Sequence, residues 1–98
     1  MTINEWSDAT AMAQAVQNKT VSPRELVEAT IREAERTNPN INAIVSQRYQ
    51  KALEEAETRD FSEKPFAGVP IFLKDLGQEQ AGEPSTAGSR LFTSYRAK

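Results

Sequence analysis

The chain has 98 residues, with 12 basic and 14 acidic side chains and neither cysteine nor histidine, a length that allows one small domain or part of a larger one. The missing residue types exclude a disulfide framework, a thiolate nucleophile, a Ser–His–Asp triad and metal sites built on those ligands. Charges of both signs are interspersed, which argues against a nucleic-acid-binding face, and the strongly apolar stretch 69–73 is too short to span a membrane.

The first helix is predicted to begin just after residue 7. Ser7 is the expected N-cap, and Asp8 in the first turn suits the positive end of the helix dipole. Trp6, just before this cap, is expected to pack as an anchor. A polar run at 17–20 should end the helix. Its apolar stripe is narrow and built mostly from small side chains, namely Ala9, Met12, Ala13 and Val16.

The second helix has the clearest start signal in the sequence. Ser22 and Glu25 have the spacing of a capping box, in which each side chain accepts a hydrogen bond from the other residue's amide. Pro23 falls at the first helical position, where its missing N–H costs nothing. Asn38 and Pro39 are expected to stop the helix. Its buried stripe is predicted to consist of Val27, Thr30, Ile31 and Ala34.

A third helix is expected between the segment 41–45 and the polar connector that starts at residue 60. Tyr49, Ala52, Leu53 and Ala56 share one face of it, and the opposite side is charged. The preceding segment 41–45 is too short to decide between a strand and an extended link. A polar connector is predicted over 60–65.

The character of the sequence changes at residue 66. The apolar run 66–73 contains β-branched and aromatic residues and is typical of a strand buried on both faces of an α/β sheet. From Gly77 onward a loop is predicted, and residues 89–95 could begin another helix. A single strand has no hydrogen-bond partner. Either 41–45 pairs with it or its partner strands lie outside these 98 residues, and we favour the second interpretation.

Lys74 directly follows this predicted strand. Burial favours the neutral form of a lysine amine, which can then act as a base toward a serine hydroxyl where no histidine exists. The alternative is that Lys74 simply ends a strand and points into water. Asp75 beside it is either a helper that orients the surroundings of the lysine or a hydrogen-bonded cap of the strand.

The surrounding motifs resemble those of the amidase signature family. The stretch 68–76 reads Gly-Val-Pro-Ile-Phe-Leu-Lys-Asp-Leu, and Ser-Thr-Ala-Gly-Ser follows at 85–89. The family pattern is Leu-Ala-Gly-Val-Pro-Ile-x-x-Lys-Asp with Thr-x-Gly-Ser farther on. The capped Ser-Pro-x-Glu-Leu helix and the Asn-Ala-Ile-Val segment at 42–45 also match, so the resemblance spans nearly the whole chain.

The resemblance implies a serine hydrolase that cleaves amide C–N bonds through an acyl-enzyme, using a Ser–cis-Ser–Lys triad. Lys74 would be the catalytic base, and Asp75, Thr86, Gly88 and Ser89 would belong to a loop near the active site. In the family both triad serines and the oxyanion-hole donors lie farther along the chain, beyond the residues present here. The implied partners are a small-molecule amide substrate and the remainder of the amidase domain, with no metal and no cofactor.

The expected fold is therefore α/β and incomplete as it stands. Residues 1–98 would be the N-terminal part of a single amidase domain, with a helical segment over 1–60 and the first strand and active-site loop of a mixed sheet over 66–98. Such a fragment is expected to be inactive alone. The sequence opens without an export signal, so a cytoplasmic location with no membrane or nucleic-acid partner is predicted.

Three other interpretations remain open. Ser85 or Ser89 could act as a nucleophile beside Lys74, although side-chain-to-backbone hydrogen bonds that shape the loop are the simpler role for both. The chain could instead be a non-catalytic helical protein-interaction module whose narrow apolar faces dock on a partner. It could also be a regulatory or decoy remnant that pairs with a complementary amidase fragment.

Overall fold

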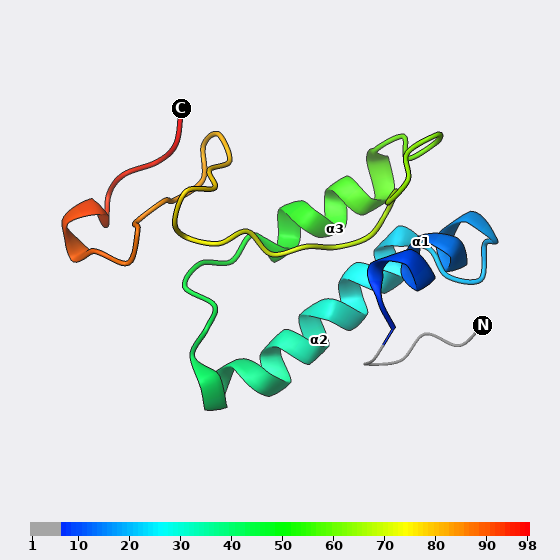
Figure 1. Ribbon diagram of the computed structural model, residues 1–98, viewed down its shortest axis with the longest axis horizontal. Helices are drawn as coiled ribbons and strands as arrows, with labels where there is room; N and C mark the ends of the chain where they lie inside the picture. Colours follow the sequence, from blue (N-terminus) through cyan, green and yellow to red (C-terminus); the bar gives the residue numbers. More distant parts are fainter. Residues whose placement is uncertain (1–6) are drawn as a thin grey trace. The chain divides into compact units, whose positions relative to one another are not determined.

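The computed structural model describes residues 7–98, so Trp6 lies outside the described residues. The elements in chain order are α1 (Ala9–Gln17), α2 (Pro23–Ile41), α3 (Tyr49–Thr58) and a 3₁₀ helix, η1 (Arg90–Phe92) (Figure 1). The chain divides into two compact units, each described here by itself. The first unit contains the three α-helices and continues to residue 70; the second consists of residues 44–46 and 71–98.

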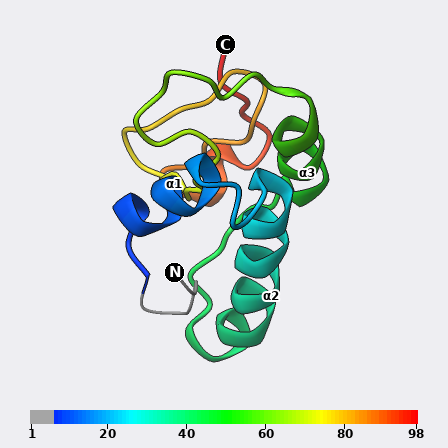
Figure 2. The ribbon, with the colours of Figure 1, turned by 90° about the vertical axis from the view of Figure 1, so that its right-hand side faces the viewer.

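In the first unit, α1 lies near the N-terminal end of α2, and a short turn joins the two helices (Figure 2). Asp8, rather than Ser7, is the N-cap of α1, and its carboxylate accepts a hydrogen bond from the Ala11 amide at 2.8 Å. Serine and aspartate are both strong N-caps, and the helix begins one residue later than predicted. The helix ends at Gln17, within the polar run that was expected to stop it. Ala13 is buried as predicted, whereas Ala9 of the predicted stripe is exposed and the buried Ala15 lies outside the stripe.

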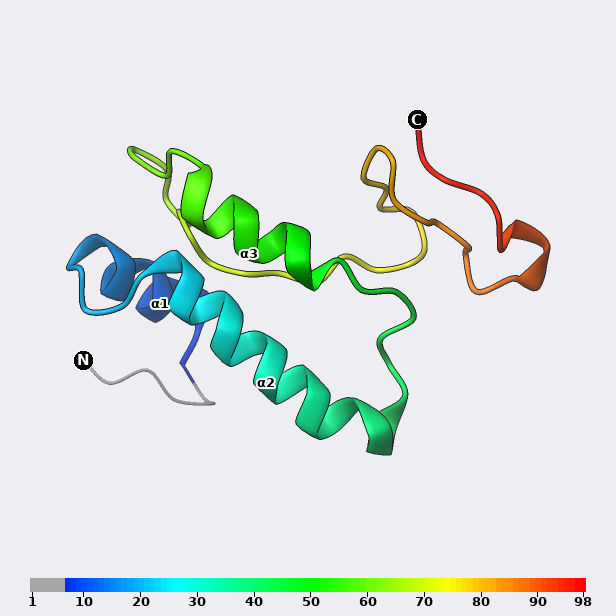
Figure 3. The same cartoon turned by 180° about the vertical axis from the view of Figure 1, so that it is seen from behind.

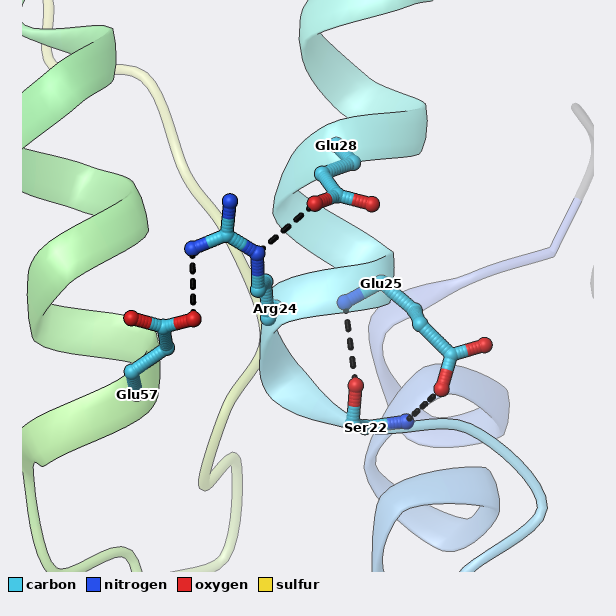
Figure 4. Close-up of polar contacts among 5 residues, drawn as sticks. All are labelled: Ser22, Arg24, Glu25, Glu28 and Glu57. Carbon is cyan, nitrogen blue, oxygen red and sulfur yellow. Dashed lines mark hydrogen bonds and ion pairs between the residues drawn. The ribbon is translucent and has the colours of Figure 1, made fainter.

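The capping box at the start of α2 is confirmed (Figure 4). The Glu25 amide donates to Ser22 Oγ at 3.1 Å, and the Ser22 amide donates to Glu25 Oε1 at 3.2 Å. Pro23 occupies the first turn, as predicted. Of the predicted stripe, Val27 and Ala34 are buried and the other two residues are half-buried.

The predicted end of α2 at Asn38 and Pro39 is wrong, because the helix continues through Pro39 to Ile41. Proline removes one backbone donor, so one hydrogen bond of the last turn is lost, but only two residues of the helix follow Pro39 and the loss does not spread further. Asn42 then ends the helix in the left-handed conformation, with its N–H donating to the Asn38 carbonyl. The Asn38 side chain accepts from the Ala43 amide at 2.8 Å, which gives the chain beyond the proline a further hydrogen bond.

We expect Ser22→Ala to lower the free energy of unfolding by about 1 kcal/mol, because the Glu25 amide loses its acceptor. Urea denaturation followed by far-UV circular dichroism measures the change. Ser62→Ala is the matched control, since it removes an exposed serine hydroxyl that bonds to Asp60 at 2.7 Å, outside the helices. Equal midpoints for the Ser22→Ala variant and the unaltered protein would contradict the prediction.

Helices α2 and α3 pack side by side (Figures 1 and 3). Leu26, Val27 and Ala34 of α2 are buried, as is Ala56 of α3. At the edge of this contact Arg24 donates to Glu28 at 2.8 Å on its own helix and to Glu57 at 2.6 Å on α3 (Figure 4). All three side chains are partly exposed, so apolar burial contributes more to this packing than the ion pairs do.

The described residues form no β-strand, so the strand expected over 66–73 is not formed in this chain, and 41–45 does not pair with it. A strand needs a partner for its backbone groups, and these residues offer it none. The apolar side chains that a sheet would cover are instead exposed: Phe66, Ile71, Phe72, Leu73 and Leu76 are 48–76% accessible. The helix expected over 89–95 is reduced to the single turn of η1. No helix among residues 7–98 is long and apolar enough to cross a membrane.

Candidate functional site

Lys74 lies in the second unit, at the end of the apolar run. Its side chain is exposed, and its backbone N–H donates to Gln78 Oε1 at 2.9 Å. The described residues therefore do not bury the amine. The hydrogen bond to Gln78 fixes the backbone just after the apolar run. It could not be predicted from the sequence, because a single glutamine in a polar loop belongs to no recognisable motif.

Asp75 and Thr86 are joined by two hydrogen bonds, although they lie eleven positions apart in the sequence. The Thr86 amide donates to Asp75 Oδ1 at 2.7 Å, and the Thr86 hydroxyl donates to Oδ2. We call this pair the Asp75–Thr86 clasp. The Thr86 hydroxyl, the Thr86 amide and, to a smaller extent, the Gly88 and Ala87 amides hold the pKa of Asp75 below its ordinary value. The carboxylate is therefore ionised at neutral pH.

Thr86 also organises the residues that follow it. The Gly88 amide donates to Thr86 Oγ1 at 3.3 Å, and the Ser89 amide donates to the Thr86 carbonyl at 2.9 Å. Ala87 and Gly88 both have positive φ, at 51° and 71°. This tight turn keeps the chain beside the Asp75 carboxylate, and the glycine adopts its conformation at no steric cost.

Ser89 caps η1, because its Oγ accepts a hydrogen bond from the Leu91 amide at 3.2 Å. The Ser85 hydroxyl donates to Glu79 Oε1 at 3.3 Å. Ser89 thus makes the side-chain-to-backbone hydrogen bond expected of a residue that shapes a loop, whereas the Ser85 hydroxyl bonds to a side chain instead.

The ends of this loop are held together by a short antiparallel pairing. The Gly82 amide donates to the Ala97 carbonyl at 2.8 Å, and the Ala97 amide donates to the Glu83 carbonyl at 3.0 Å. Pro84 and Arg96 form an isolated antiparallel bridge, which lies between the Ala97–Glu83 bond and a bond from the Ser85 amide to the Tyr95 carbonyl at 3.5 Å. Ala97 is buried. These residues show no alternating apolar pattern, so this pairing could not be predicted from the sequence.

The structure thus brings four of the five predicted site residues into one hydrogen-bonded cluster: Asp75, Thr86, Gly88 and Ser89. Lys74 joins the cluster through the backbone, as the neighbour of Asp75. Among residues 7–98 no group of acidic side chains is arranged to hold a metal ion. The loop 85–89 is thus hydrogen-bonded to Asp75, the residue that follows Lys74.

Comparison with known proteins agrees with the motifs. The chain is similar to a 6-aminohexanoate-cyclic-dimer hydrolase of Pseudomonas sp. (strain NK87), with 41% identity over 87% of this chain and 17% of that protein. It is 40% identical to a lipoamidase of Enterococcus faecalis over 86% of this chain and 12% of that protein. It is 38% identical to an acylamidase of Rhodococcus erythropolis over 87% of this chain and 19% of that protein.

The chain therefore spans less than a fifth of the length of these relatives. No solved structure matches it. The family model described as Amidase matches residues 25–98. This region contains α2 apart from its first two residues, α3, Lys74 and the cluster formed by Asp75, Thr86, Gly88 and Ser89. Because this match covers most of the chain, the chain belongs to the amidase family.

Proposed function

We propose that this chain is the N-terminal part of a longer amidase that hydrolyses carboxamide C–N bonds, and that Lys74 is the catalytic base. The observation that carries the proposal is the position of Lys74, which follows the Gly-Val-Pro-Ile run and precedes an aspartate bound to the Thr-x-Gly-Ser loop. The relatives' names differ in the amide they specify, so the proposal extends only to the class they share.

In this proposal the neutral Lys74 amine takes a proton relayed through one serine from a second, nucleophilic serine. The nucleophile's oxygen bonds to the amide carbon, and the C–N bond breaks as the relayed proton passes to the leaving nitrogen. Water then cleaves the acyl-enzyme, releasing the acid and restoring the serine. Both serines and the donors that stabilise the oxyanion would lie farther along the longer protein, and the 98-residue chain alone would be inactive.

The exposed apolar run supports this proposal. Ile71, Phe72 and Leu73 are each 48–76% exposed immediately before Lys74. Burying three such side chains is worth several kcal/mol in total, on the scale of about 1.5–3 kcal/mol for each. We infer that the remainder of the amidase covers them, that 66–73 then becomes a strand of its sheet, and that the same burial gives Lys74 the water-poor surroundings a lysine base needs.

Two measurements test the proposal. The intact mass of the protein made in its native cells should be several-fold above 10.9 kDa. That protein, mixed with a simple aryl amide and quenched with acid, should carry the mass of one acyl group on a serine. The 98-residue chain is the control and should acquire none.

A native mass near 10.9 kDa, or amide hydrolysis without an acylated serine, would contradict the proposal. The short form would direct attention to the interaction-module hypothesis, in which the apolar run 66–73 docks on another protein. Saturable binding of the isolated chain to a defined partner would then support that role.

A further inference from the structure

The clasp and the Gln78 contact fix the backbone on which the Lys74 side chain is carried. A lysine amine is carried on a flexible four-carbon stem, so it occupies a fixed position only where its surroundings hold it. A general base must lie within hydrogen-bond reach of the proton that it takes. Fixing the backbone from which the side chain starts is one part of meeting that requirement.

We propose that the Asp75–Thr86 clasp positions Lys74 against the loop 85–89, which makes Asp75 and Thr86 positioning residues for the amidase reaction. The proposal rests on the function proposed above for Lys74. It assigns to Asp75 neither a proton transfer nor a contact with substrate. The carboxylate acts through the backbone that it shares with the lysine.

The geometry at Asp75 supports this role. Both of its carboxylate oxygens accept hydrogen bonds from one residue, which fixes the direction of the side chain as well as its distance. Hydrogen bonds to an ionised carboxylate are about twice as strong as neutral ones. On the other side of Lys74 the apolar run is exposed, whereas the clasp and the Gln78 contact hold the backbone at Lys74 and Asp75.

The far end of the clasp is itself well held. Thr86 accepts hydrogen bonds from the Gly88 and Ser89 amides, and Ser89 caps η1. The pairing of Gly82 with Ala97 closes the base of the same loop. The clasp therefore connects the backbone at Lys74 to a hydrogen-bonded loop rather than to an unstructured segment.

The test uses the complete amidase and three variants at the clasp. Thr86→Val keeps the shape and the backbone N–H but removes the hydroxyl donor, Thr86→Ser keeps both donors, and Asp75→Asn removes the charge. We expect Thr86→Val and Asp75→Asn to lower kcat by about 10- to 100-fold, the scale of a misplaced catalytic group, with KM nearly unchanged. Thr86→Ser should restore most of the rate. The Asp75→Asn/Thr86→Val double variant should lose less than the product of the two single fold-losses, because both changes act on the same pair of hydrogen bonds.

Thr93→Val is the matched control, because it makes the same side-chain change in the same unit and removes a hydroxyl that donates to the Arg90 carbonyl at 2.6 Å. Its kcat should stay at the unaltered value. A Thr86→Val variant with unaltered kcat, an equal loss in Thr93→Val, or a loss matched by a lower melting temperature would overturn the proposal. If Lys74→Met abolishes activity and Thr86→Val does not reduce it, only the clasp is wrong; if Lys74→Met is active, the proposed function is wrong.

Discussion

Replacing Lys74 with methionine in the complete amidase is expected to lower kcat by roughly 10²–10⁴-fold, the range that a positioned acid–base group contributes. Methionine keeps an unbranched, apolar stem in place of the lysine stem but cannot accept a proton. The nucleophilic serine would then keep its hydroxyl proton and attack the amide far more slowly. The rate of acylation, measured by rapid quench with an aryl amide, is the step that should fall.

Lys74→Arg separates the loss of a base from the loss of a charge. An arginine side chain keeps the positive charge but does not give up its proton at any pH at which proteins are studied. We therefore expect Lys74→Arg to be as slow as Lys74→Met. A variant that kept most of its rate with arginine would show that the charge, and not the basicity, is what matters at this position.

Lys64→Met is the matched control for this substitution. Lys64 is an exposed lysine in the connector after α3, and it takes no part in the hydrogen-bonded cluster of Asp75, Thr86, Gly88 and Ser89. The Lys64→Met variant should hydrolyse amides at the unaltered rate. The three lysine variants should have the same melting temperature as the unaltered protein. Near-normal hydrolysis by Lys74→Met, or an equal loss in Lys64→Met, would contradict the assignment of the base.

The helices could be predicted from sequence because their signals are local. Ser22 and Glu25 lie three residues apart, so the interaction that starts α2 can be recognised in the sequence itself. The errors in the helical region also have local causes. Ser7 and Asp8 are both suitable caps, and the rule that proline stops a helix fails where Pro39 falls in the last turn.

The strand and the clasp depend on residues far apart in sequence. The apolar run 66–73 has the composition of a strand, but composition cannot supply the neighbouring backbone that a strand requires, and among the described residues none pairs with it. The order of the motifs predicted which residues belong to the site, but it did not predict the hydrogen bonds between Asp75 and Thr86. An aspartate and a threonine eleven positions apart form no periodic pattern that would pair them.

The glycine that opens the Gly-Val-Pro-Ile motif has a structural reason to be there. Gly68 has φ +82° and turns the chain back against the helices. A Cβ at this position would lie 2.9 Å from Pro23 Cγ, 3.1 Å from Pro23 Cβ and 3.4 Å from Val16 Cγ1. Two parts of the family resemblance, the capped Ser-Pro helix and the Gly-Val-Pro-Ile run, thus meet at this contact.

We expect Gly68→Ala to lower the free energy of unfolding of the complete protein by about 2–5 kcal/mol. A left-handed conformation costs an alanine about 1–2 kcal/mol, and forcing a methyl group into a packed contact typically costs a further 1–3 kcal/mol or so. Relief by movement of the neighbour is limited, because the Pro23 ring is rigid and belongs to the first turn of α2. Urea denaturation of the two proteins measures the difference.

Gly77→Ala separates the two contributions. Gly77 has nearly the same φ, +78°, but nothing lies within 4 Å of the position its Cβ would take. It should therefore show only the conformational cost of about 1–2 kcal/mol. If the two variants are equally stable, the contact with Pro23 contributes nothing and the motif glycine is needed for its conformation alone. If Gly68→Ala is the less stable of the two by 1 kcal/mol or more, close packing against the first turn of α2 is what excludes a side chain there.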